Sequence, residues 1–248
     1  MFAVRFNVTD PIKKYLPKAV SRHPDKGDIT VQNLLQMQSG IEFENDGYYG
    51  HSDIMRRQVP ADCVDFILGL RLAHAPGEYF YYKDGDPHLV SAILQHQTGK
   101  TTRDWAKEVL FSKIDFQNYT WEVYKDGVTL GAYGISATPR EMARIGCLVL
   151  NRGNWNGQQI VNAAWIDEMT GVKVSKEKVN YHQKSFGYFW WIDERRGVSC
   201  MFGKGGQYVF VKSSKNLVVV TTADPNAGHI FELETALGIF DKIDEIAK

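Results

Sequence analysis

The chain has 248 residues, of which 44% are hydrophobic, and is long enough for one large domain or two small intertwined ones. Its 29 basic and 29 acidic residues cancel, so no overall field favours nucleic acid or an anionic membrane surface. No apolar run approaches the roughly 18 residues that a membrane span needs. The apolar stretch in the start MFAVRFNVTDP is too short for a secretion signal. Composition therefore predicts a globular protein with no nucleic-acid partner and no membrane span, and leaves its compartment open.

The three cysteines are far apart in the sequence, at Cys63, Cys147 and Cys200. They lack the close pairs of a zinc site or a redox dithiol. We therefore expect three buried free thiols, and the histidine spacing likewise gives no reason to expect a metal site.

Helical signals dominate residues 28–170. Residues 29–35 predict a short helix that ends before Ser39-Gly40. A second helix is predicted from Asp86, which precedes Pro87 as an N-cap residue precedes a first helical proline, to Gly99 as terminator.

A third helix is predicted to begin at the capping box Thr138-Pro139-Arg140-Glu141. Its apolar residues repeat at helical spacing, and Asn151-Arg152-Gly153 is expected to end it. These residues are Met142, Ile145, Leu148 and Val149.

Strand signals dominate residues 184–248. Aromatic and β-branched residues predict antiparallel strands over 186–192, 207–211 and 217–222. The tail predicts an amphipathic helix that covers one face of this thin sheet; its apolar residues are Ile230, Phe231, Leu233, Leu237, Phe240, Ile243 and Ile246. The chain is therefore predicted to be α+β, with an antiparallel sheet beside a mostly helical region.

Two stretches are candidates for chemistry. One places Tyr82 and Asp84 just before the predicted 86–99 helix. The other precedes a strand with small and polar residues, a form in which the backbone can approach a ligand closely. These residues are Gly203, Lys204, Gly205, Gly206 and Gln207.

The order of these stretches, with 131–138 and 154–161 between them, resembles the β-lactamase-related serine hydrolases. This family contains class C β-lactamases, penicillin-binding D,D-peptidases, esterases and amide hydrolases, and the similarity is greatest to the 6-aminohexanoate-dimer hydrolase branch. The resemblance runs from Asp10-Pro11-Ile12-Lys13 to Ala223. It implies one β-lactamase/transpeptidase-like domain over residues 1–248 and acyl transfer from an amide or ester to serine, followed by hydrolysis.

The resemblance also implies roles for the candidate residues. Tyr82 matches the family's proton-relay tyrosine in Tyr-x-Asn or Tyr-x-Ser, whereas Asp84 departs from the amide or hydroxyl usual there. The family's substrate-flanking strand, Ala-x-Gly-x-Gly-Gly-Gln, matches Met201 to Gln207 and puts the oxyanion-binding N–H on Lys204. No metal or organic cofactor is implied, and the expected ligand is a small amide, ester or peptide-like molecule.

The family's nucleophile is the serine of a Ser-x-x-Lys helix that precedes the segment matched by Asp10. Only nine residues precede Asp10 and none is a serine. The one Ser-x-x-Lys of the sequence, Ser175 to Lys178, lies in a highly charged run without an apolar helical face, which favours a surface loop over a buried lysine base. We therefore expect the chain to lack the nucleophile helix and the first two strands of the family's five-stranded sheet.

Three interpretations remain open. The chain is a fragment or mis-started product of a serine hydrolase, or a short pseudoenzyme that binds ligands without catalysis, or a subunit completed by a second chain that carries the nucleophile. In each case a sheet lacking strands leaves an exposed edge, so we expect a tendency to self-associate through it.

Overall fold

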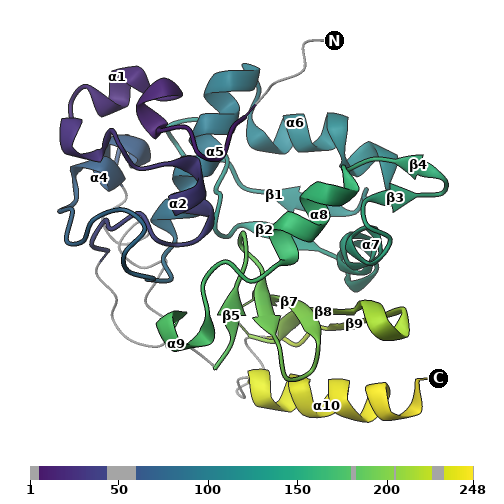
Figure 1. Cartoon of the computed structure of the whole chain (residues 1–248). Coiled ribbons are helices and arrows are strands. Elements are labelled where there is room, and N and C mark those ends of the chain that lie inside the picture. The colour runs from purple at the N-terminus through teal and green to yellow at the C-terminus, as the bar shows by residue number, and fades with distance from the viewer. Residues whose placement is uncertain (1–5, 44–59, 180–182, 204, 225–231, 248) are drawn as a thin grey trace. The chain divides into compact units, whose positions relative to one another are not determined.

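A computed structural model describes residues 6–43, 60–179, 183–203, 205–224 and 232–247 (Figure 1). The chain divides into two compact units. The first comprises residues 1–109 and 120–136, and the second comprises residues 110–119 and 137–248. Within the described ranges, no helix has the length and apolar character needed to cross a membrane.

The first unit is mostly helical. Thr30 begins α2 with a reciprocal capping box, because its hydroxyl accepts from Asn33 N at 3.1 Å and its own N–H donates to Asn33 Oδ1 at 2.9 Å. The helical elements of this unit are η1 (Ile12–Lys14), α1 (Pro17–Val20), η2 (Pro24–Lys26), α2 (Val31–Leu35), α4 (Cys63–Gly69), α5 (Gly85–Thr98) and α6 (Thr102–Val109).

The predicted start of α5 is wrong by two residues. The helix begins at Gly85, and Asp84 rather than Asp86 occupies the N-cap position. Asp86 cannot cap because its carboxylate is buried and accepts the Ser39 hydroxyl at 2.7 Å. The predicted end is confirmed, since Gly99 adopts a φ of 68° and donates its N–H to Gln95 O.

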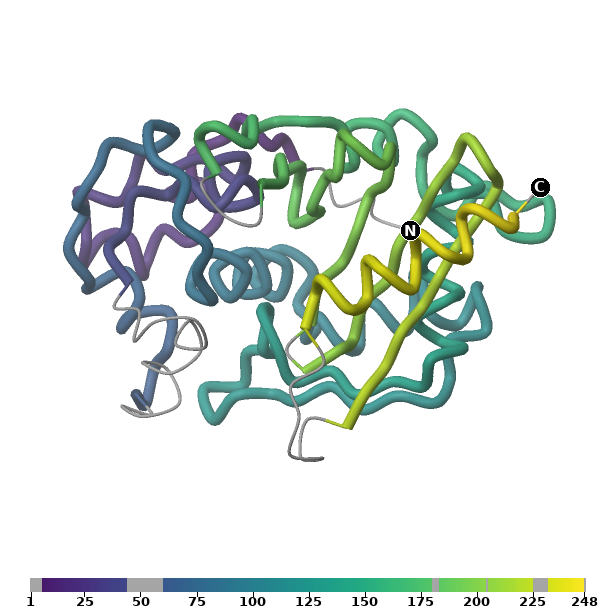
Figure 2. Tube along the Cα trace, turned by 90° about the horizontal axis from the view of Figure 1, so that it is seen from below, coloured from purple at the N-terminus to yellow at the C-terminus, as the bar shows by residue number. Residues whose placement is uncertain are grey.

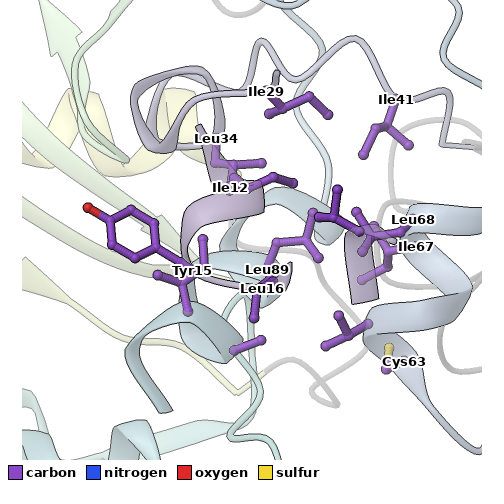
Figure 3. Packing of buried hydrophobic residues seen from close by; sticks show 14 of the residues in the cluster. Ile12, Tyr15, Leu16, Ile29, Leu34, Ile41, Cys63, Ile67, Leu68 and Leu89 are labelled. Atoms are coloured by element: carbon purple, nitrogen blue, oxygen red, sulfur yellow. The ribbon is translucent and has the colours of Figure 1, made fainter. Parts of the chain in front are cut away.

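The core of the first unit gathers side chains from its helices. Figure 3 shows Ile12, Leu34 and Leu89 in one cluster, although they come from η1, α2 and α5. All three are fully buried. This core holds α5 in place, and Tyr82 and Asp84 directly precede that helix.

The second unit is built on a five-stranded antiparallel sheet in the order β5-β6-β7-β8-β9. Its strands are β5 (Ser185–Phe186), β6 (Trp191–Asp193), β7 (Val198–Gly203), β8 (Gln207–Lys212) and β9 (Leu217–Thr221). The remaining elements of the chain are η4 (Phe111–Lys113), β1 (Tyr119–Trp121), β2 (Ile135–Ala137), α7 (Pro139–Leu150), β3 (Asn154–Trp155), β4 (Gln158–Gln159), α8 (Ala163–Thr170), α9 (Lys176–Val179), η5 (Ser213–Lys215) and α10 (Leu233–Ile246).

The sheet has two more strands than the three predicted. The predicted strand over 186–192 is divided into β5 and β6, because Phe189 has a φ of 58° and Gly187 N donates to Trp190 O across the turn. Strand β7 was not predicted from its residue pattern. The α+β class and the antiparallel pairing are confirmed.

Helices cover both faces of this sheet. Figure 2 shows α10, in yellow, lying over the strands, and the Phe240 and Phe210 rings are 5.3 Å apart. The predicted tail helix is therefore confirmed over Leu233–Ile246, whereas Ile230 and Phe231 lie outside the described residues. On the other face α7 packs closely, since a Cβ at Gly146 would lie 2.6 Å from Val218.

The predicted start of α7 is confirmed in part. Thr138 is the N-cap and its hydroxyl accepts from Glu141 N at 3.3 Å. The Glu141 carboxylate does not complete the box, and instead accepts from Asn118 at 3.2 Å and Arg144 at 3.1 Å.

The cysteines are free thiols, as predicted. Cys63 and Cys200 are buried, but Cys147 on α7 is only half-buried.

Candidate functional site

Tyr82 and Asp84 lie in the first unit, where an extended stretch enters α5. Tyr82 is half-buried and Asp84 is 8% exposed. Directly after them, Gly85 packs so closely on Phe43 that a Cβ there would lie 3.0 Å from the ring. The first residue of α5 is thus held against Phe43, in the core of the first unit.

The position of Asp84 favours a negative charge. It is the N-cap residue of a 14-residue helix, and the unpaired N–H groups at such an end carry partial positive charge. Among the described residues its carboxylate makes no capping hydrogen bond. A carboxylate can therefore be accommodated at the start of this helix.

A buried polar cluster missed by sequence reasoning lies next to these residues. Asp86 is fully buried and accepts from Ser39 Oγ at 2.7 Å and from Ser39 N at 3.4 Å. Lys83 is 1% exposed, and its Nζ lies 3.6 Å from Asp86 Oδ2. Burial lowers the pKa of Lys83 and raises the pKa of Asp86, while each partner's charge opposes these shifts.

The second candidate stretch lies in the second unit, where it connects β7 to β8 and so precedes a strand as expected. Gly203 ends β7 and pairs with Gln207, which begins β8. Gly205 and Gly206 form the turn with φ values of 84° and 105°, which a side chain would disfavour. The predicted strand element over Met201 to Gln207 is therefore corrected: Met201 to Gly203 lie in β7, Gly205 and Gly206 form a turn, and Gln207 begins β8. Lys204 lies outside the described residues, and the substrate-flanking role stays a prediction.

Hydrogen bonds hold this turn to the end of β9. Gln207 Nε2 donates to Gly205 O at 3.3 Å and to Ala223 O at 3.1 Å. The Thr221 hydroxyl donates to Gly206 O at 3.3 Å. Both turn glycines are buried, so Gly203 and Gln207 are the half-exposed described members of the stretch.

The Ser175 to Lys178 segment does not have the geometry of a serine-lysine pair. Ser175 precedes the one-turn helix α9 (Lys176–Val179), in which Lys178 is exposed. The Ser175 hydroxyl bonds instead to the Glu177 carboxylate, whose pKa it lowers. Because a lysine base must be buried to lose its proton near neutral pH, this segment is a poor nucleophile site.

Comparison of the sequence with known protein families defines the class to which this molecule belongs. A model of the Beta-lactamase family matches residues 4–232. The chain therefore belongs to the Beta-lactamase family, as its motif order predicted.

Individual relatives are distant in sequence. The 6-aminohexanoate-dimer hydrolase of Paenarthrobacter ureafaciens is 24% identical over 257 residues, which cover 94% of this chain and 64% of the relative. A Bacillus anthracis structure assigned as a 6-aminohexanoate-dimer hydrolase superposes with a TM-score of 0.79 at 21% identity, covering 98% of this chain and 68% of that one. A penicillin-binding protein from Bacillus halodurans superposes with a TM-score of 0.74 at 14% identity, covering 96% and 79%. This chain thus spans less than two thirds of the length of its curated hydrolase relative.

Proposed function

We propose that this protein contributes to a serine-hydrolase site that transfers the acyl group of a small amide, ester or peptide-like ligand. Membership of the Beta-lactamase family is the observation that carries the proposal. Tyr82 would be the proton relay, with Asp84 as its charged neighbour. Gly203, Gly205, Gly206 and Gln207 at the β7–β8 connection would flank the substrate, together with Lys204, which lies outside the described residues.

The proposed reaction has two steps. A serine hydroxyl attacks the acyl carbon and passes its proton to a base, and the bond to the leaving nitrogen or oxygen breaks as Tyr82 delivers a proton to that atom. Water then attacks the acyl-enzyme and regenerates the hydroxyl. A backbone N–H aimed at the developing oxyanion, for which Lys204 is the candidate, stabilises such a transition state by about 3 kcal/mol.

We further propose that these 248 residues alone do not form the acyl-enzyme. The support is the environment of the sequence's single Ser-x-x-Lys, whose Lys178 is exposed and whose Ser175 is bonded to Glu177. In that case the isolated chain is either one part of a complete hydrolase or a pseudoenzyme that binds its ligand without turnover.

The test uses the purified chain with nitrocefin, a p-nitrophenyl ester, a fluorescent penicillin and the linear dimer of 6-aminohexanoate. The last probe is chosen because a relative is named for it. We expect no hydrolysis and no adduct by intact-mass spectrometry, but saturable binding of at least one probe that is weakened by Tyr82→Phe.

Two results would contradict the proposal. A covalent adduct on any serine of the chain would overturn the claim that it lacks a nucleophile. The absence of binding by all four probes, or binding unaffected by Tyr82→Phe, would refute the assignment of Tyr82 to the site.

A further inference from the structure

The backbone on the N-terminal side of Tyr82 is attached to one rigid segment, residues 37–41. The Tyr81 N–H donates to Met37 O at 2.9 Å. This segment is tightly constrained, since Met37 has a φ of 57° and a Cβ at Gly40 would lie 2.1 Å from His74 O. The segment is therefore a firm support for the residue before Tyr82.

The backbone on the C-terminal side of Tyr82 is attached to the same segment through buried charges. Lys83 Nζ lies 3.6 Å from the Asp86 carboxylate, which accepts both the hydroxyl and the N–H of Ser39. The Ser39 hydroxyl also accepts the Ile41 N–H at 3.3 Å. This series of contacts links Lys83 to residues 39–41.

Burial makes the contact between Lys83 and Asp86 costly to break. Lys83 is 1% exposed and Asp86 is fully buried, so an ammonium group displaced from the carboxylate would leave two unpaired charges in the interior. In an extended stretch adjacent side chains point to opposite sides, so Lys83 can point inward while its neighbour Tyr82 remains half-exposed. An inward-held lysine thus restricts the backbone that presents the phenol.

We propose that Ser39, Asp86 and Lys83 form a buried positioning network that holds the Tyr82 side chain in place for its proton-relay role. The inference rests on the proposed function of Tyr82. None of the three residues is proposed to contact the substrate. Their effect is transmitted through the backbone on either side of Tyr82.

The first test compares two lysine substitutions by NMR of protein with ring-labelled tyrosine, in which Tyr82→Phe identifies the Tyr82 signal. Lys83→Met is expected to shift and broaden that signal. Lys184→Met is the matched control, because Lys184 is 8% exposed and pairs with the buried Asp193 at 3.2 Å, but belongs to the second unit. It should leave the Tyr82 signal unchanged.

A double variant separates positioning from simple charge compensation. Lys83→Met with Asp86→Asn removes both charges and keeps the side-chain shapes. If the network positions Tyr82, its signal stays shifted, because the attachment is still absent. Recovery of the wild-type signal in the double variant would overturn the proposal, as would an unchanged signal in folded Lys83→Met.

Ser39→Ala covers the case in which the lysine variants do not fold, since it removes only a hydroxyl. It is expected to broaden the Tyr82 signal, and a wild-type signal in this variant would then refute the network.

Ligand affinity distinguishes failure of this inference from failure of the proposed function. If a probe binds wild-type protein, Lys83→Met should weaken binding about tenfold through misplacement of Tyr82, whereas Lys184→Met should not weaken it. Equal affinity in Lys83→Met and wild type would contradict the positioning role. If no probe binds wild type, the proposed function fails, and the NMR comparison alone decides whether the network holds Tyr82.

Discussion

His88 provides a direct test of the packing in the first unit. It lies on α5 and is fully buried. Neither ring nitrogen has a hydrogen-bond partner among the described residues, and its ring meets the Tyr124 ring edge at a centroid distance of 6.2 Å. Burial lowers the pKa of His88 from 6.5 to about 4, against the opposing influence of Asp126 and Asp62.

The shift has a defined consequence for stability. Because the pKa is lower in the folded state, the unfolded chain binds the His88 proton more readily between pH 6.5 and pH 4, and stability falls as the pH falls through this range. At 1.36 kcal/mol per pKa unit, the loss from pH 7 to pH 5 is about 2 kcal/mol, and the loss by pH 4 is about 3 kcal/mol.

The assay is urea unfolding of the wild type and His88→Leu at pH 7 and pH 5. The wild type should lose about 2 kcal/mol more than the variant between the two pH values. At pH 7 the variant should also be more stable, since it buries no unpaired nitrogen. His88→Gln is the matched control, because it cannot titrate in this range but keeps a buried polar group; it should show the weaker pH dependence without the gain at pH 7.

Equal pH dependence in the wild type and His88→Leu would contradict a lowered pKa of His88 in the folded state. It would mean that His88 takes up its proton in the folded state as readily as in the unfolded chain, which requires a partner or solvent access at this site.

Three further predictions test the local structure. Thr138→Ala should lower the free energy of unfolding by about 1 kcal/mol through loss of the α7 cap, measured by urea titration. Gly40→Ala and Gly157→Ala both place a side chain at positive φ, but only at Gly40 would the Cβ meet backbone, His74 O at 2.1 Å. Gly157→Ala should therefore cost about 1 kcal/mol and Gly40→Ala several times more in thermal or urea unfolding, and equal losses would contradict the clash. Strand β9 is paired on one side only among the described residues and carries no charge, so light scattering should detect self-association that Leu217→Lys reduces; a cooperative, monomeric melt of the wild type would contradict this.

Features fixed by neighbours in the sequence could be predicted. Thr138 and Gly99 mark a helix start and a helix end because the cap and the left-handed turn depend on a few consecutive residues. The tail helix could be predicted from its apolar spacing, and Phe240 lies against the sheet accordingly.

Features fixed by contacts between residues far apart in the sequence could not be predicted. The 186–192 run has the composition of one strand, but a Cβ at Gly187 would lie 2.3 Å from Met169 O, so a remote backbone segment helps to set the turn that divides it. The pairing of Lys83 with Asp86 also escapes a sequence pattern, because charged residues three apart are common on surfaces and only the tertiary structure shows both to be buried.

Asp86 shows how the two kinds of information compete at the candidate site. An aspartate before a proline is a good N-cap, yet Ser39 offers its carboxylate a hydroxyl and an N–H in the interior. With Asp86 committed to that contact, the helix begins earlier and the N-cap position passes to Asp84. The carboxylate beside Tyr82 therefore has a local physical basis: Asp84 lies at the positive end of α5, and the burial of Asp86, two positions further along the chain, leaves the N-cap position to it.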